Sequence, residues 1–183
     1  MSQTKTIIFF SFMLMVSGLL LVACSNDDTE DANKEVITKI LEHQFTGPDE
    51  KFVNLIWNPK YTTVVNNKEE NKELEEYVEE IYGSYFVSSY MSSFLTSSGT
   101  SYPILAHLTE HKLNLADIKI EQSEKMSTRY TFVATVGYWK DGEEEKIADV
   151  SGEVIFSTKE EGKIGRFQYT GDGGLGKLMN QQD

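Results

Sequence analysis

The chain has 183 residues and carries 29 acidic against 17 basic side chains, which gives a formal net charge of −12. This length fits one domain of ordinary size. The negative charge argues against nucleic acid and anionic lipid surfaces as partners, because both are polyanionic. Cys24 is the only cysteine, which excludes a disulfide framework, a cysteine metal cluster and a catalytic thiol in the folded domain.

The first 23 residues have the pattern of a secretory signal. Lys5 is their only charged side chain, and an uncharged, mainly apolar run from Ile7 to Ala23 follows it. The run is short for a transmembrane helix, which needs about 20 apolar residues. It ends on small residues immediately before Cys24, as a signal cleavage site does.

The residues Leu21-Val22-Ala23-Cys24 resemble the lipobox of bacterial lipoproteins. The resemblance implies that residues 1–23 are removed and that Cys24 is acylated. The protein would then be held by lipid at the outer face of the bacterial cell membrane. An uncleaved anchor is the alternative, and it would leave the domain on the same side. Arginine is rare beside lysine, with only Arg129 and Arg166, which favours an AT-rich, Gram-positive source.

Residues 24–31 are polar and acidic, with no apolar side chains to bury after Cys24, and we predict a disordered tether there. Residues 32–170 are predicted to form one domain. Residues 171–183 are rich in glycine at their start and are predicted to be a flexible tail.

Apolar residues recur at helical spacing through the first part of the domain. A first helix is predicted from Ala32 to Phe45, and a second begins at Pro48 and ends at Asn58-Pro59. A third starts near Asn71, and its pattern extends weakly toward Leu95. The segments between and after them are predicted as a short strand (Tyr61–Val65), a loop (Ser97–Ser101) and a short helix (Pro103–His111).

The last third of the chain changes to the two-residue period of strands. Four strands are predicted, with turns between the last three, so the sheet should end in an antiparallel meander. The strands are Leu115–Glu121, Arg129–Trp139, Lys146–Ser157 and Lys163–Thr170.

Strand parity predicts which side chains face the core, because a slip of one residue turns every side chain over. A three-residue turn, Lys140 to Gly142, would keep both inward sets even-numbered and set Phe132 opposite Val150. A four-residue turn from Lys159 to Gly162 would bring Gln168 beside Glu153. The predicted inward residues of the last three strands are Tyr130, Phe132, Ala134, Val136, Ala148, Val150, Gly152, Val154, Phe156, Phe167 and Tyr169.

Helices followed by a curved antiparallel meander define an α+β fold. The element order and the closing strand Lys163–Tyr169 resemble the cone-shaped nuclear-transport-factor-like fold, also called ketosteroid-isomerase-like. A cystatin-like arrangement of helix on sheet is the alternative. Neither fold specifies a function.

Enzymes of the cone fold place an acid or base inside the cone. Parity puts Asp117, Asp149 and Glu153 on the outer face, so we predict no catalytic residue on the strands. We expect a non-enzymatic binding module for an unknown protein or a small apolar ligand. The predicted binding residues of the cone interior are Tyr130, Phe132, Tyr138 and Tyr169.

Two alternatives remain open at this stage. A small isomerase- or hydrolase-type enzyme could combine those tyrosine hydroxyls with a carboxylate from a helix, such as Glu76 or Glu80. The outer sheet face could instead support a homodimer. Its predicted contact residues are Thr131, Val133, Ile147 and Ile155.

Two sequence motifs suggest chemistry that their context does not support. His107 and His111 match H-x-x-E-H, the inverted zinc-protease motif, but the chain after them is too short for the large domain of that family. Residues 171–176 match G-x-G-x-x-G outside any βαβ unit, so a dinucleotide site is not indicated. The acidic run Glu143–Glu145 lacks the spacing of a calcium loop. We predict neither a metal site nor a cofactor.

Overall fold

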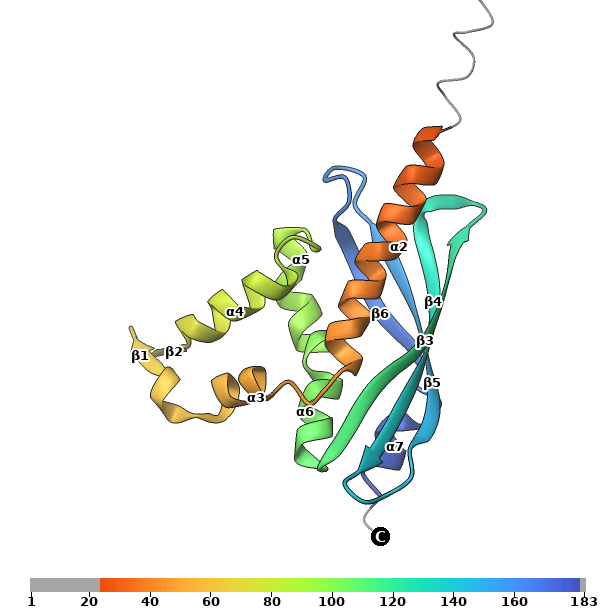
Figure 1. Ribbon diagram of the computed structural model, residues 1–183. Helices are drawn as coiled ribbons and strands as arrows, with labels where there is room; N and C mark the ends of the chain where they lie inside the picture. Colours follow the sequence, from red (N-terminus) through yellow and green to blue (C-terminus); the bar gives the residue numbers. More distant parts are fainter. Residues whose placement is uncertain (1–23, 182–183) are drawn as a thin grey trace, which may run out of the picture.

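The computed structural model describes residues 24–181, and the predicted signal segment 1–23 lies outside them. Helices pack on one face of a curved antiparallel sheet with strand order β3-β4-β5-β6 (Figure 1). The predicted α+β class is therefore confirmed. Within the described part of the chain, no helix is both long and apolar enough to cross a membrane.

Helix α2 (Cys24–Phe45) begins eight residues before the predicted start at Ala32. Its C-terminal half is anchored in the core, since Ile37, Ile40 and Phe45 are fully buried. Residues 24–31, at the N-terminal end of the helix, contain no glycine or proline, and acidic residues are favourable near a helix N-terminus. The prediction of a disordered tether over residues 24–31 is therefore wrong, because the packed end extends the helix through the acidic residues.

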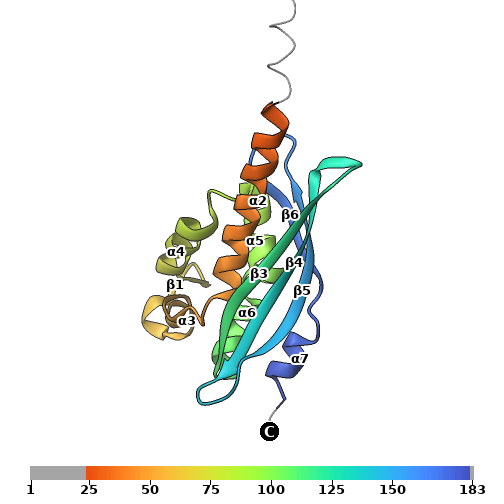
Figure 2. The ribbon, with the colours of Figure 1, turned by 45° about the vertical axis from the view of Figure 1, so that its right-hand side comes forward.

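A small lobe follows, which we call the helical lobe (residues 50–82). It stands away from the sheet, as two views show (Figures 1 and 2). Asp49 accepts a hydrogen bond from the Phe52 amide and begins the first helix, and Asn71 begins the second in the same way through the Leu74 amide. The lobe consists of α3 (Glu50–Trp57), η1 (Pro59–Tyr61), β1 (Thr63–Val65), β2 (Lys68–Glu70) and α4 (Lys72–Tyr82).

The strand prediction for this lobe was confirmed in part. Strand β1 lies within the predicted Tyr61–Val65 segment, but its partner β2 was not predicted. Asn66 and Asn67 form the turn with φ angles of 52° and 62°, values that asparagine tolerates better than most residues. Every residue of β1 is exposed, so the hairpin adds nothing to the core.

The chain returns to the sheet through α5 (Ser88–Phe94), the π-helical turn η2 (Leu95–Gly99) and α6 (Ser101–Leu108). The third helix does not extend to Leu95, because it ends at Tyr82 and the chain then pairs Phe86 with Ile164 of the last strand. The predicted loop at residues 97–101 is wrong as well. Phe94 packs where a side chain on Gly99 would stand, and this contact holds the turn against the core.

The sheet consists of β3 (His111–Ser123), β4 (Met126–Lys140), β5 (Lys146–Phe156) and β6 (Ile164–Gly171). The predicted inward faces are confirmed for β4 and β5, where Tyr130, Phe132 and Val150 are at most 2 % exposed. The predicted pairing is displaced by two residues, since Phe132 lies opposite Gly152. Strand parity predicts which face a side chain lies on, but any odd number of turn residues satisfies it. The turn between β4 and β5 is longer than the predicted three residues, which displaces the pairing.

The pairing of the last strand is confirmed where Glu153 lies opposite Gln168. Phe167 is buried as predicted and Tyr169 is partly buried. A register shift before Phe156 turns Ile164 inward, and this change of face was not predicted. β-Bulges are common at sheet edges, where β6 lies, and they bend the bulged strand.

The predicted flexible tail contains a short helix, α7 (Leu175–Met179), within the described residues. Leu175 and Met179 are at most 1 % exposed, and both belong to the core. Asp172 accepts hydrogen bonds from the Gly174 and Gly176 amides and so begins the helix. The prediction of a flexible tail was therefore wrong for this segment, because Leu175 and Met179, one helical turn apart, pack into the core.

Candidate functional site

The predicted binding residues of the sheet interior lie in a filled core. Tyr130, Phe132 and Tyr138 are 0 %, 2 % and 4 % exposed. The hydroxyl of Tyr130 is occupied, because it accepts hydrogen bonds from Asn33 at 3.2 Å and Gln122 at 2.8 Å. The ring of Phe132 packs against those of Phe167 and Tyr169. These positions form the core of the fold.

Tyr169 lies near a buried polar cluster at the end of helix α2, but its own hydroxyl has no hydrogen-bond partner among the described residues. Gln44 donates hydrogen bonds to the Tyr82 hydroxyl at 2.7 Å and to the Gly99 carbonyl at 2.9 Å. Burial raises the pKa of Tyr82 and of Tyr169 far above the usual tyrosine value. Both hydroxyls therefore stay protonated at any physiological pH, which suits a structural role and does not suit a general base.

The helix-borne carboxylates do not reach this interior. Glu76 and Glu80 are exposed on α4. Among the described side chains, the buried polar residues are Asn33, Gln44, Ser98 and His111, and none of them is a carboxylate. The arrangement that the enzyme alternative requires is thus missing from residues 28–181.

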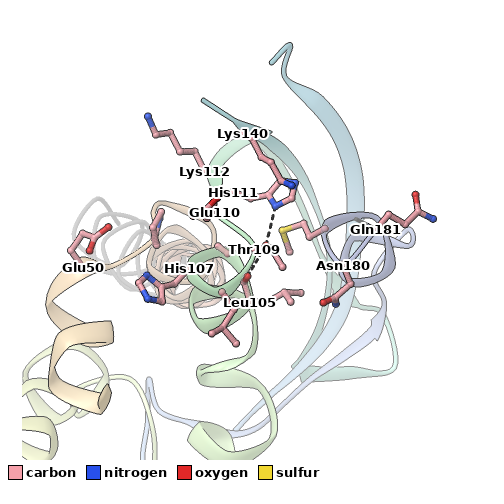
Figure 3. A pocket seen from close by; sticks show the side chains of 14 residues that line it. Glu50, Leu105, His107, Thr109, Glu110, His111, Lys112, Lys140, Asn180 and Gln181 are labelled. Carbon is pink, nitrogen blue, oxygen red and sulfur yellow. Dashed lines mark hydrogen bonds between the residues drawn. The ribbon is translucent and has the colours of Figure 1, made fainter. Parts of the chain in front are cut away.

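A polar cleft lies where α6 meets β3, beside α7, and it has a volume of about 770 Å³ (Figure 3). His107 and His111 both line it, but α6 ends at Leu108, so the two imidazoles do not share a helical face. Figure 3 shows them apart, with the His111 ring directed to the Thr109 hydroxyl at 2.9 Å. The described residues contain no group of three metal-ligating side chains.

The electrostatics of the cleft are mixed. Burial lowers the pKa of His111, and the nearby Lys140 ammonium lowers it further. Lys112 is paired with Asp141. Glu110 has a left-handed backbone with a φ of 60°, which is unusual for glutamate, but it occupies the position after a helix end where this conformation is common. The ion pair of Lys112 and the backbone of Glu110 are thus both explained by local structure and do not indicate a ligand.

An apolar recess of about 550 Å³ lies between the helical lobe and α5, and we call it the lobe recess. Its walls come from the helical segments α3, α4, α5 and η2. Its apolar lining consists of Phe52, Ile56, Leu74, Val78, Phe86, Met91 and Leu95, and its polar lining of Glu75, Glu79, Ser88, Ser92, Thr96 and Thr100.

The lobe recess has the general character of a small-molecule site. Such sites are concave, have volumes of about 300–1,000 Å³ and are lined mainly by apolar side chains with a few polar groups. Phe52, Val78 and Phe86 are nearly fully buried and form a firm floor, while Leu74 and Met91 remain partly exposed. This recess was not predicted from the sequence, which showed an amphipathic third helix but not how three helices would meet.

The two exposed apolar residues among the predicted dimer contacts, Val133 and Ile147, do not form a continuous patch on the outer sheet face. Val133 lies opposite Ser151 and Ile147 lies opposite Gly137, so the two exposed side chains are four positions apart along the sheet. Asp149 and its partner Thr135 lie between them. The homodimer stays a prediction.

Comparisons of the chain with models of protein families, with curated proteins and with solved structures found no match.

Proposed function

We propose that this protein is a lipid-anchored, non-enzymatic binding module at the outer face of a bacterial cell membrane, with the lobe recess as its binding site. The observation that carries the binding role is the contrast between a filled sheet interior and an open, apolar recess at its side. A filled core leaves no room for a substrate, whereas a preformed recess offers apolar surface to a ligand.

The proposed anchor rests on the lipobox-like residues and on Cys24, the first residue of helix α2. One acyl chain anchors a protein only marginally, so stable attachment would need the two chains typical of bacterial lipoproteins. The net charge of −12 would repel an anionic membrane surface, so attachment should depend on the lipid. The kinship with the cone-shaped fold, or with the cystatin-like alternative, is likewise a proposal based on element order.

Two measurements test these parts separately. For the anchor, cells expressing the full chain or Cys24→Ala are labelled with a fatty-acid analogue, and detergent phase partition follows. We expect label only in the wild type, and equal label in Cys24→Ala would contradict the anchor.

For the binding role, the folded protein is screened against small apolar compounds while methyl resonances of the recess are followed by NMR. We expect shifts at Met91 and Leu74. Turnover of any compound that depends on Tyr130 or Tyr169 would contradict the non-enzymatic role.

A further inference from the structure

We propose that the lobe recess selects apolar ligands that carry a positive charge, such as lipophilic amines or quaternary ammonium compounds. This inference rests on the binding role proposed above and adds the ligand class. Its basis is the charge of the recess. The lining residues include two carboxylates, Glu75 and Glu79, and no lysine, arginine or histidine.

The two carboxylates are free to meet a cation. Glu75 and Glu79 are one helical turn apart on α4, so they line the same edge of the recess. Neither takes part in an ion pair among the described side chains. A charge that no protein group neutralises is available to a ligand of opposite sign.

Glu79 also lies close to the recess. A Cβ atom built on Gly83 would lie 2.2 Å from Oε1 of Glu79, so the carboxylate is folded back against the end of α4. Gly83 itself lines the recess. The absence of a side chain at this position therefore lets the carboxylate lie beside the apolar surface.

The rest of the lining supports the same ligand class. Met91 and Leu95 supply flexible apolar contacts, and methionine adapts readily to guests of different shape. The other polar lining groups are hydroxyls, which are neutral. The Thr96 hydroxyl is already used on the Ser92 carbonyl at 3.0 Å, and the Thr100 hydroxyl on the Leu95 carbonyl at 3.2 Å. An anionic apolar molecule would bring its charge toward two carboxylates with no cation to offset them.

The test compares three probes that share a ten-carbon chain and differ in charge: decyltrimethylammonium, decanol and decanoate. The protein is residues 24–183 with Cys24→Ser, which retains the whole core, since the core cluster runs from Ile37 to Met179. Circular dichroism confirms folding, calorimetry gives the affinities, and the Met91 methyl resonance reports the site.

We expect decyltrimethylammonium to bind roughly two- to thirtyfold more tightly than decanol, the range for two exposed charge contacts. Decanoate should bind more weakly than decanol. Glu75→Gln with Glu79→Gln should remove the preference for the cation, so that decyltrimethylammonium and decanol then bind with similar affinity. The matched control, Glu76→Gln with Glu80→Gln, changes the net charge equally at residues of the same helix that do not line the recess, and it should keep the preference.

The outcomes separate the two proposals. Equal affinity for decanol and decyltrimethylammonium, or loss of the preference in the control pair alone, would overturn the cation selectivity while leaving the binding role. If no probe shifts the Met91 resonance, the recess is not a binding site and the proposed function fails as well.

Discussion

The sheet and the helical lobe are stabilised in different ways. In β4 every second side chain from Tyr130 to Tyr138 is buried, and pairing with both neighbours fixes the strand. The lobe buries only part of each helix, exposes every residue of β1, and depends on polar contacts at helix ends. A region with few buried contacts opens at lower free energy than a packed sheet. The packing of the sheet should therefore determine the free energy of global unfolding, and the lobe should open locally at a lower free energy.

The largest expected effect comes from the sheet core. Phe132→Ala removes a ring that is 2 % exposed and packs over Gly152, so unfolding free energy should fall by about 3–5 kcal/mol. Urea unfolding followed by circular dichroism measures the change. Gly152→Ala should also destabilise the fold, since its Cβ would lie 2.2 Å from the Phe132 ring. If the unfolding free energy fell by less than about 1 kcal/mol in both variants, the sheet core would not be the main source of stability.

The lobe should respond locally to a smaller change. Asn71 accepts a hydrogen bond from the Leu74 amide at 2.9 Å and donates one to the Leu55 carbonyl at 2.7 Å. Asn71→Ala should cost about 1–2 kcal/mol. Hydrogen exchange should then speed up in α4 while the amides of β4 keep their protection. Asn71→Asp retains the cap but loses the donor, and should have an intermediate effect.

Uniform acceleration across α4 and β4 in Asn71→Ala would show that lobe and sheet unfold together. That result would contradict the separation of the two regions.

The junction between the helices and the sheet offers a stabilising change. Glu110 lies between α6 and β3 with a φ of 60°, a conformation that costs a non-glycine residue about 1–2 kcal/mol. Glu110→Gly should raise unfolding free energy by roughly 0.5–1 kcal/mol, because glycine gives back part of the gain as unfolded-chain entropy. Glu110→Gln removes the charge but keeps the backbone strain. A similar gain in both variants would assign the effect to charge.

The smallest expected effect is the pH response of His111, at the start of β3. Its pKa is lowered by burial and by Lys140, so the folded state favours the neutral ring. The unfolded state then binds more protons below about pH 6.5, and stability should fall as the pH decreases through that value. Thermal unfolding at pH 7.5 and 5.5 measures the loss. His111→Gln should show a smaller loss, and an equal one would contradict this role.

The sequence predicted the sheet better than the lobe, for a physical reason. Alternation along a strand shows which side chains meet the core, and Tyr130, Ala134 and Val150 all lie where parity placed them. Pairing depends on turn length, and seven residues between Tyr138 and Lys146 satisfy parity as well as three do. The glycine turn was still informative, since Gly142 is left-handed with a φ of 89°.

The candidate site could not be found in the same way. Leu74 and Val78 predicted that α4 is amphipathic, but the recess depends on α3 and α5 approaching the same helix from different directions. Periodicity carries no information about such contacts. The predicted interior site failed because tyrosines at strand positions are large apolar side chains, and they fill the core that the helices cover.

Helix α2 has a consequence for how the molecule stands on a surface. Its 22 residues span about 33 Å, and its far end is packed in the core. A lipid on Cys24 would thus be joined to a helix that continues into the core and not to a flexible tether, and tilt of the helix would tilt the whole protein. The turn between β3 and β4 would lie near the bilayer, and helix α7 would lie at the opposite end of the molecule (Figure 1).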